Sequence, residues 1–377
     1  MYVVSLVFTI IFLFTSCSSY NVQTRDNQFR AEILDRNGKI LALKSIEYSD
    51  ISFKRHYPYK QVAAHVIGYA LKKQTSYTGK KGVEKEYNNL LSQNKNVQLT
   101  IDIRLQKYIS GLFQGKSGVA IVMGIDGEIL SVGSYPEYDL NIFIDGMKRS
   151  EYQKLANYPQ KPFSNKFIHA LYRPGSLIKP VINMYYPSEK KALEHGINDI
   201  AKTLKRYGFG VQTGIDLPNE FHGLVPSKKW KMEKYQEPWY IGETKAVLKG
   251  EGSLLVTPIQ IANYTVLLAT GQLPQPYVKK GIQKSKDILN KNEFVRLKTI
   301  QNTLSKTVVD KKLKLATFYA ELNERNHIYS WTTSYAPVDN PKYIVTILLE
   351  NKYNSERELK SIILKIYNKL GELNYVH

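Results

Sequence analysis

The residues best suited to chemistry lie in the stretch RPGSLIKP, residues 173–180. Ser176 and Lys179 are three positions apart, so on a helix they share a face and the ammonium can lie beside the hydroxyl. A lysine whose pKa is lowered by burial can then accept the serine proton, which makes the serine a nucleophile. Pro174 and Gly175 would open that helix and leave backbone N–H groups free to stabilise negative charge. The alternative is an ordinary helix start, because Ser-x-x-Lys also occurs by chance.

Other stretches that look catalytic have the wrong spacing or surroundings. GLFQGKS, residues 111–117, has three residues between its glycines, whereas a phosphate-binding loop needs four and runs from a strand into a helix. GEGSLL, after Lys249, lacks the third glycine of a dinucleotide fingerprint. The seven histidines include no pair with the spacing of a zinc-protease helix, and the single cysteine excludes a Cys-based zinc site. The sequence therefore predicts no cofactor and no metal site.

The first residues are typical of an export signal. Residues 2–14 are almost wholly apolar, and Thr15 and Ser16 lead directly into Cys17. This run, at 1.5 Å per residue, covers roughly 20 Å of helix, short of the ~30 Å hydrocarbon core. The stretch resembles a bacterial lipoprotein signal, in which the cysteine becomes the lipidated N-terminus; an uncleaved membrane anchor and a buried N-terminal segment are the alternatives. The first two of these three place the body of the protein outside the cytoplasm, at a membrane.

Composition and charge favour a globular protein with an anionic partner or a solvated basic face. The 377 residues are 43% hydrophobic, enough to bury a sizeable core. Lys and Arg number 53 against 33 Asp and Glu, which gives a formal charge of +20. Such a charge attracts a polyanion or an anionic membrane surface, although a solvated basic face explains it equally well. Nucleic acid is a poor candidate, because the sequence has no Cys/His metal module, basic heptad helix or aromatic RNA-binding signature.

Two turns that contain glycine predict β-hairpins. Asn37-Gly38 lies between two apolar runs in AEILDRNGKILAL, which favours a hairpin with a type I′ turn. Asp126-Gly127 lies between the apolar runs 119–125 and 128–132 and predicts a second hairpin. Between the two, TIDIRLQKYISGLF has apolar residues at helical spacing, after a Thr100 that suits the N-cap.

The last part of the chain predicts two helices and a strand. VTPIQIANYTVLLAT predicts a helix that begins at Pro258 and has a capping box formed by Thr257 and Gln260. Residues 342–349, KYIVTILL, predict a strand, and a helix with a capping box at Ser355 follows it. The apolar stripe of that helix consists of Leu359, Ile362, Ile363, Ile366 and Leu370. Together these elements predict an α+β fold with helices packed on a mostly antiparallel sheet.

The serine box and several colinear stretches resemble one protein family. YRPGSLIKP resembles the active-serine box of penicillin-binding proteins, in which Ser-x-x-Lys is one of three motifs. Further stretches resemble class B members of the penicillin-binding protein 2 type, in the same order along the chain, from about Arg30 to Asn351. They are RAEILDRNGKILA, YPYKQVAAHVIGYA, GKKGVEKEYNNLL, VQLTIDIRLQ, GVAIVMGIDGEILSVGSYPEYDLNIF, FGVQTGIDLPNE, PWYIGETKAVLKGEGSLLVTPIQIAN and SYAPVDNPKYIVTILLEN.

The resemblance implies a fold and a domain organisation. It implies an α+β penicillin-binding transpeptidase domain, an antiparallel sheet flanked by helices, over residues 111–377. A reduced N-terminal pedestal domain of the dimerisation type is expected over residues 21–110, after a signal or membrane-attachment segment at residues 1–20. The chain is accordingly expected at the cytoplasmic membrane, with its bulk on the extracytoplasmic, periplasmic side.

The resemblance also implies an activity in peptidoglycan synthesis and cell elongation, that of a serine D,D-transpeptidase. Ser176 would attack the D-Ala-D-Ala amide of a stem peptide with Lys179 as its general base, and the amine of a second stem would resolve the acyl-enzyme. The backbone N–H of Ser176 and one from a sheet strand would form the oxyanion hole. A peptidoglycan stem peptide or a β-lactam is the ligand implied, and elongation-machinery proteins are the partners implied.

Two of the three family motifs are missing or altered. A Ser-x-Asn motif should stand between the serine-bearing helix and FGVQTGIDLPNE, yet residues 181–206 contain none, and SEK at Ser188 is a poor substitute. Pro187 should also end the serine-bearing helix early. The best match to the third motif, Lys-Thr/Ser-Gly-Thr, is KLAT, which keeps Lys314 and Thr317 as weak substrate-binding candidates.

These departures leave three functions open. In KLAT, Ala316 replaces the glycine that lets a substrate backbone approach the strand. In the family the missing Ser-x-Asn positions the substrate amide and passes a proton to the leaving amine, and the loss of general-acid help alone costs about 10²–10⁴-fold. The chain is then either a weak serine acyl enzyme or a non-catalytic partner that binds wall precursor or the elongation machinery. A basic surface lipoprotein that binds anionic polymers is the third alternative.

Overall fold

The computed structural model describes residues 30–47, 52–73, 76–282, 284–306, 313–324, 327–351 and 355–376. The predicted export signal at residues 2–14 and its Cys17 lie outside these ranges, so export and lipidation stay predictions. Within the described ranges, no helix is both long enough and apolar enough to span a bilayer.

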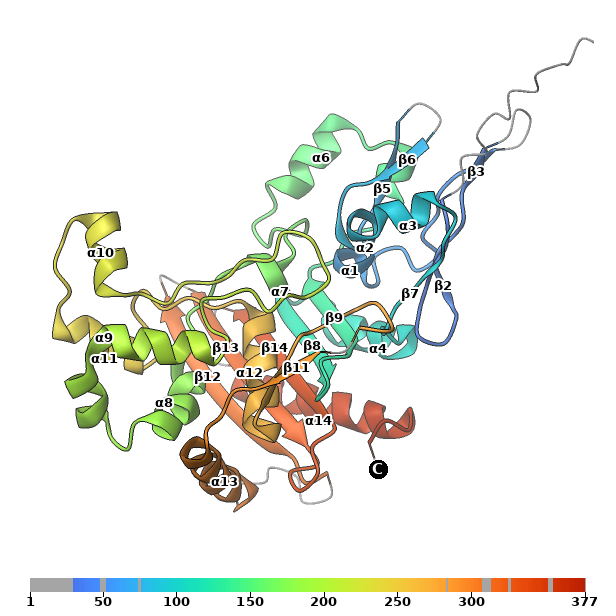
Figure 1. Ribbon diagram of the computed structural model, residues 1–377. Coiled ribbons are helices and arrows are strands. Elements are labelled where there is room, and N and C mark those ends of the chain that lie inside the picture. Colours follow the sequence, from blue (N-terminus) through green and yellow to red (C-terminus); the bar gives the residue numbers. More distant parts are fainter. Residues whose placement is uncertain are drawn as a thin grey trace, which may run out of the picture.

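A five-stranded antiparallel sheet forms the centre of the molecule (Figure 1). Its strands, in order across the sheet, are β12 (Ala316–Glu324), β13 (His327–Ala336), β14 (Tyr343–Asn351), β8 (Gly118–Gly124) and β9 (Ile129–Tyr135). Every neighbouring pair is antiparallel, and the β8–β9 pair confirms the hairpin predicted at Asp126-Gly127. In the sheet as described, β12 pairs with a strand on one side only, so its other edge is free to meet another part of the chain.

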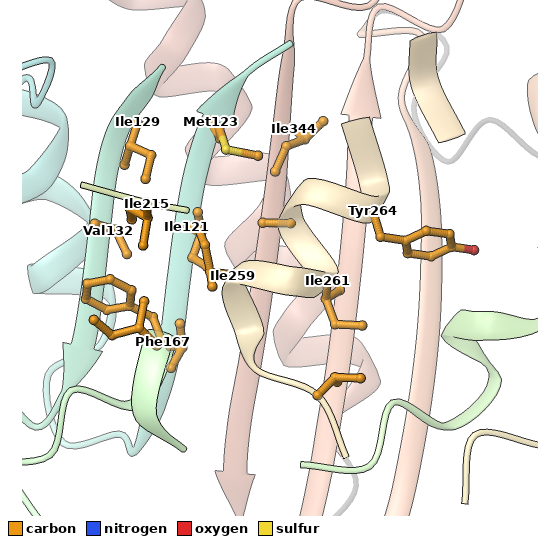
Figure 2. Packing of buried hydrophobic residues seen from close by; sticks show 14 of the residues in the cluster. Ile121, Met123, Ile129, Val132, Phe167, Ile215, Ile259, Ile261, Tyr264 and Ile344 are labelled. Carbon is orange, nitrogen blue, oxygen red and sulfur yellow. The ribbon is translucent and has the colours of Figure 1, made fainter. Parts of the chain in front are cut away.

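Helices cover both faces of this sheet, which confirms the α+β prediction. α12 (Pro258–Thr270) lies on one face, where Ile259 and Ile261 belong to one buried cluster with Ile121 of β8 (Figure 2). α14 (Glu356–Glu372) and α4 (Ile103–Leu112) cover the other face in a second cluster. Each fully buried isoleucine contributes about 1.5–3 kcal/mol, so the two clusters hold the helices on the sheet.

The predicted starts of α12 and α14 follow from local signals. α12 begins at Pro258, and the N–H of Thr257 donates to Oε1 of Gln260 at 3.0 Å. α14 follows Ser355, and the side chains of its apolar stripe are buried. These side chains are Leu359, Ile362, Ile363, Ile366 and Leu370. The box of Thr257 and Gln260 fixes where α12 begins. Ser355 is the N-cap of α14 but makes no side-chain capping hydrogen bond, so the capping box predicted there is not formed. The apolar stripe fixes which face of α14 turns to the sheet.

The predicted cap of α4 was wrong. Asp102 is the N-cap, because its carboxylate accepts from the N–H of Arg104 at 2.9 Å. Thr100 lies two residues earlier and donates its hydroxyl to the carbonyl of Ile129 at 2.7 Å. Both residue types suit an N-cap, but the hydroxyl of Thr100 is already bonded to Ile129 of β9.

The N-terminal part of the described chain is built from short strands and helices, at the upper right of Figure 1. β1 (Ile33–Leu34) pairs with β2 (Ile40–Ala42) and β7 (Val97–Gln98), β3 (Ile46–Glu47) with β4 (Ser52–Phe53), and β5 (Ala70–Lys73) with β6 (Ser76–Gly79). The helices are α1 (Ala64–Ile67), α2 (Gly82–Glu86) and α3 (Asn88–Ser92).

The hairpin predicted at Asn37-Gly38 is present, but its turn is not type I′. Type I′ needs a positive φ at both central residues, whereas in this loop only Gly38 has one, at 80°. The Oδ1 of Asp35 instead accepts from the N–H groups of Asn37 and Lys39, each at 2.8 Å. The aspartate side chain therefore shapes the loop.

A buried ion cluster holds this N-terminal part together. Glu84 accepts from Nε of Arg30 at 2.5 Å and from Nε of Arg55 at 2.7 Å, and the hydroxyl of Tyr57 donates to the same carboxylate at 2.9 Å. Burial alone would raise the pKa of Glu84, but the charges of the two arginines hold it below its usual value. Because both partners are buried, removal of one leaves an uncompensated charge inside the protein.

The remaining elements connect these two regions and surround the sheet. They are α5 (Ile142–Asp145), α6 (Arg149–Ala156), α7 (Lys166–His169), the 3₁₀ turn η1 (Gly175–Ile178), α8 (Lys179–Tyr185), α9 (Glu189–Arg206), α10 (Lys228–Tyr235), α11 (Ile241–Leu248), β10 (Gln272–Pro274), β11 (Ser285–Asp287) and α13 (Lys291–Lys306).

Candidate active site

Ser176 lies in the 3₁₀ turn η1, which runs directly into α8. Its hydroxyl donates to the backbone carbonyl of Tyr319 in β12 at 3.1 Å. The serine segment therefore lies against the free edge of β12. We call this contact between residues 173–176 and residues 319–324 the η1–β12 seam.

Gly175 is required for the close approach at this seam. Its φ is 57°, and a Cβ at this position would lie 3.0 Å from Cδ1 of Leu322 and 3.2 Å from Cβ of Ala320. On its other side, its N–H donates to the carbonyl of Gly250 at 3.0 Å. A Cβ on Gly250 would in turn lie 2.0 Å from the carbonyl oxygen of Gly175. The two glycines thus allow GEGSLL and β12 to close on the serine segment from two sides.

Arg173 bonds the serine segment to the GEGSLL stretch and to β12. Its Nε donates to the carbonyl of Gly252 at 2.7 Å, and its Nη1 pairs with Oε1 of Glu324 at 2.8 Å. Its own carbonyl accepts from Nε1 of Trp331 in β13 at 3.1 Å. The seam is therefore held by an ion pair at one end and by the serine hydrogen bond at the other.

A half-buried carboxylate anchors the chain four residues before Ser176. Glu350 at the end of β14 accepts from the hydroxyl of Tyr172 at 2.7 Å, from Nζ of Lys166 at 2.5 Å and from the hydroxyl of Ser117 at 2.5 Å. Burial alone would raise the pKa of Glu350, but the charge of Lys166 and these hydrogen bonds hold it below its usual value. The carboxylate is therefore a fixed anchor for the serine segment.

Lys179 is not joined to Ser176 by a hydrogen bond. It is the first residue of α8, and its side chain is exposed to solvent. Within the described ranges its ammonium makes no hydrogen bond or ion pair. The hydroxyl of Ser176 donates to Tyr319 and to no other group there. The roles of Ser176 as nucleophile and Lys179 as base stay predictions.

The KLAT match lies before the stretch of β12 that faces Ser176. Lys314 is exposed and pairs with Asp339 at 2.7 Å. It stands five residues before Tyr319, which is up to about 16 Å at 3.3 Å per residue of strand. Thr317 is closer, but its hydroxyl is buried and has no hydrogen-bond partner in the described structure. Substrate binding by Lys314 and Thr317 therefore stays a prediction.

The interval that should contain Ser-x-Asn is occupied by the junction of two helices. α8 ends at Tyr185, and Tyr186 is extended, with φ −105° and ψ 126°, as expected before Pro187. The predicted early stop of the serine-bearing helix is therefore confirmed. Ser188 caps α9 by accepting from the N–H of Lys191 at 3.3 Å. Its hydroxyl therefore has a structural partner in α9.

Sequence reasoning missed the groups that surround the serine segment. The partner of Ser176 is a backbone carbonyl 143 residues further along the chain, for which no side-chain pattern exists. Glu350 could have been noticed, since it is a charged residue at the end of the apolar run KYIVTILL. Tyr172 lay within the quoted serine box but had no assigned role.

Comparison with known proteins identifies the family. The family described as "Penicillin binding protein transpeptidase domain" matches residues 183–368, and "Penicillin binding protein A dimerisation domain" matches residues 30–115. Peptidoglycan D,D-transpeptidase MrdA of Haemophilus influenzae is 25% identical over 432 residues, covering 79% of this chain and 66% of the relative. The protein of that name in Salmonella typhimurium is 28% identical over 332 residues, covering 62% of this chain and 53% of the relative.

Solved structures agree with this assignment. Penicillin-binding protein PBP2 from Helicobacter pylori, in complex with MreC, has a TM-score of 0.84 at 26% identity, covering 93% of this chain and 98% of that chain. Pseudomonas aeruginosa PBP2 shares the fold, with a TM-score of 0.80 at 24% identity, covering 91% and 96%. The chain therefore belongs to the penicillin-binding proteins, and within them to the class B, PBP2 type. It spans between about half and two thirds of the length of the curated relatives that it matches.

Proposed function

We propose that this chain is a PBP2-like protein of peptidoglycan synthesis and cell elongation whose transpeptidase domain acts as a non-catalytic binding partner. The observation that carries the proposal is the hydrogen bond from the Ser176 hydroxyl to the Tyr319 carbonyl, together with the exposed Lys179. When it acts, a general base must lie about 2.6–3.2 Å, heavy atom to heavy atom, from the group whose proton it removes. A backbone carbonyl cannot serve as that base, because an amide oxygen is too weakly basic.

The η1–β12 seam also opposes substrate binding at the edge of β12. An extended peptide that pairs with this edge would lie about 4.8 Å from the strand. That space is crossed by the Ser176 hydrogen bond at 3.1 Å and by the ion pair between Arg173 and Glu324 at 2.8 Å. Productive binding would therefore require the seam to open and these contacts to break.

The alternative function is a weak serine acyl enzyme. In its favour, Ser176 lies in η1 and Lys179 begins α8, the next turn of the chain. Gly175, just before the serine, also lets the backbone come close to β12. In this version the seam opens, the hydroxyl of Ser176 turns to Lys179, which takes its proton, and the serine oxygen attacks the carbonyl of a stem peptide or a β-lactam. The C–N bond of that carbonyl breaks and its nitrogen takes the proton, so the terminal D-Ala leaves or the β-lactam ring opens. The two versions differ in one requirement. The acyl enzyme needs the hydroxyl of Ser176 for its activity in the cell, whereas the non-catalytic partner does not.

Partners, location and domain boundaries are part of the proposal. The complex of Helicobacter pylori PBP2 with MreC supports an elongation-machinery protein as the partner. Residues 1–20, with Cys17 as a lipidation candidate, would attach the chain to the cytoplasmic membrane and leave its bulk extracytoplasmic. The match of the dimerisation family over residues 30–115 supports a pedestal domain over 21–110, followed by the transpeptidase-like domain over 111–377.

A complementation experiment tests this proposal. Cells that lack the gene are supplied with the wild-type chain, with Ser176→Ala or with Lys179→Ala, and cell shape and growth are compared at equal protein levels. Both variants should restore elongation as well as wild type does. A failure of Ser176→Ala to complement, at normal abundance, would favour the acyl-enzyme alternative.

A further inference from the structure

Helix α10 exposes the kind of side chain that a helix normally buries. Of its eight residues, all within the described part of the chain, only Lys231 is buried. Met232 and Tyr235, on the same helix, are 51% and 52% exposed. A helix that packs on a protein core shows the opposite pattern, with its apolar stripe inward and its charged face outward. Packing within the described chain therefore does not account for the apolar side chains of α10.

Two more exposed apolar side chains follow at the start of α11. Tyr240 is 59% exposed and Ile241 is 66% exposed. Of the twelve large apolar side chains that are exposed in the described residues, four therefore fall within residues 232–241. Single exposed apolar residues need no explanation, whereas a group of them marks an interaction surface. We call residues 228–245 the α10–α11 patch; it lies at the end of the molecule away from the N-terminal part (Figure 1).

The α10–α11 patch is also positively charged. It holds five lysines and three glutamates. The glutamates pair with two of these lysines, Lys229 and Lys231, at 2.8–3.7 Å. Three exposed lysines, without an acidic partner in the residues described, are left over: Lys228, Lys234 and Lys245. A solvated basic face would explain these lysines alone, but it does not explain the apolar side chains between them.

The aromatic rings of the patch are in contact with its lysines. Nζ of Lys234 lies 5.4 Å from the ring centre of Trp230 and 5.3 Å from that of Tyr235. Nζ of Lys231 lies 4.6 Å from the ring centre of Tyr240. An ammonium group thus covers one face of each of these three rings. This reduces the ring area on which a sugar could stack, so the contacts disfavour a saccharide polymer as the ligand.

Exposed apolar side chains with lysines among them fit the boundary between water and the hydrocarbon of a bilayer. Trp and Tyr are enriched at that boundary, and lysines reach the phosphates while their stems stay among apolar groups. We propose that the α10–α11 patch binds the surface of a bilayer that contains anionic phospholipid. The apolar side chains enter the headgroup layer, and the unpaired lysines meet the phosphates. The side chains that enter are Met232, Tyr235, Tyr240 and Ile241.

This contact would set how the molecule lies on the membrane. Residues 1–20 are proposed to attach the chain at its N-terminal part, and the α10–α11 patch lies at the other end (Figure 1). With both in contact, the chain lies along the bilayer surface and does not project from it. The inference rests on the proposed membrane location, but it holds whether or not Ser176 is acylated.

Tryptophan quenching in the full chain tests the contact. The chain is incorporated into vesicles of phosphatidylcholine alone or with phosphatidylglycerol, in both cases with brominated acyl chains that quench nearby tryptophan. Trp230 and Trp239 lie in the patch, whereas Trp331, the third tryptophan, is fully buried and gives the background. Quenching should be strong in the anionic vesicles, weaker in the neutral ones, and reduced by high salt, which screens the lysines. The double variant Trp230→Phe, Trp239→Phe should lose it.

Lysine variants test the charge of the patch. The bound-to-free ratio of the patch, read from the quenched fraction in anionic vesicles, should fall by about 5-fold for each lysine removed. The triple variant is Lys228→Gln, Lys234→Gln, Lys245→Gln. Its matched control removes three exposed lysines from β11 and its surroundings and should quench as wild type does: Lys284→Gln, Lys286→Gln, Lys291→Gln.

A second pair of variants tests the apolar side chains. Ile241→Ser should lower the same ratio by about 10-fold, because the serine no longer places an apolar side chain in the headgroup layer. Val295→Ser on α13 is the matched control. Val295 is 64% exposed, close to the 66% of Ile241, and lies outside the patch, so its loss should leave quenching unchanged.

Flotation of the chain with the vesicles measures attachment by residues 1–20 separately. Quenching in the anionic vesicles that the patch variants reduce and the controls do not supports the inference. A chain that floats without quenching overturns it and leaves the membrane location standing, whereas a chain that does not float overturns both. Equal quenching in the two lipid mixtures, or an equal loss in the control variants, also overturns it. So does sedimentation with purified wall polymer that only the patch lysines support, in the absence of quenching, since the patch would then bind an acidic polymer.

Discussion

Glu137 is expected to make the stability of the protein depend on pH. It lies just after β9, and its carboxylate accepts from the N–H of Ala63 at 3.1 Å and from the hydroxyl of Ser110. It therefore joins α1 to α4. Burial raises the pKa of Glu137 from 4.5 to about 7, although these two hydrogen bonds oppose the rise. A carboxyl group with a raised pKa binds its proton more tightly in the folded chain than in the unfolded chain, so stability falls as pH rises through this window.

The size of the stability change follows from how far the pKa of Glu137 is raised on folding. Each pH unit between 4.5 and 7 costs at most about 1.4 kcal/mol, so ionisation of Glu137 costs up to about 3 kcal/mol by pH 8. Glu137→Gln cannot ionise, yet its amide offers an acceptor to Ala63 and a donor to Ser110. The variant should therefore match wild type near pH 4.5 and be more stable by up to about 3 kcal/mol at pH 8.

Urea unfolding at several pH values measures this effect. The informative quantity is the free energy of unfolding of the variant minus that of wild type, because other titrating groups cancel in the difference. Glu86→Gln, at an exposed position of α2, is the control for the loss of one carboxylate charge. If the Glu137→Gln difference is flat between pH 4.5 and 8, or if the variant loses stability as pH rises, the reasoning is wrong.

Two further predictions concern buried charge and backbone space, both measured by urea unfolding at pH 7. Glu84→Ala leaves its two buried arginine partners unpaired and should cost about 3–5 kcal/mol, whereas Glu86→Ala on the exposed face of the same helix should change stability by less than about 0.5 kcal/mol. Gly250→Ala should cost more than the ~1 kcal/mol of left-handed strain alone, because its Cβ would lie 2.0 Å from a carbonyl oxygen. Gly111→Ala in α4, where a Cβ meets nothing within 4 Å, should be neutral or stabilising by up to about 1 kcal/mol. Equal losses for the two members of either pair would contradict the geometry.

The parts of the fold that could be predicted from sequence are those set by neighbouring residues. The start of α12 follows from Thr257, Pro258 and Gln260, which act within one turn. The buried face of α14 follows from apolar spacing alone. The wrong cap of α4 shows the limit of such signals, because Thr100 and Asp102 both suit an N-cap, and the hydroxyl of Thr100 bonds to Ile129 instead.

The candidate site was less predictable because its contacts are long-range. A sequence motif specifies residue types at fixed spacing. It does not specify which residues of β12 lie beside Ser176, because that depends on how the strand is placed in the sheet. The assignment of KLAT to the third motif stays a prediction, and its Lys314 lies five residues before Tyr319, whose carbonyl meets Ser176.

The central claim of the proposed function is that Ser176 is not acylated. The most direct test is to incubate the full-length protein with a fluorescent penicillin at high concentration and to detect the adduct on a denaturing gel and by intact mass. An active penicillin-binding protein serves as the positive control, and Ser176→Ala gives the background. The account predicts that wild type is labelled no more than Ser176→Ala. A stoichiometric adduct on wild type that disappears in both Ser176→Ala and Lys179→Ala would contradict it.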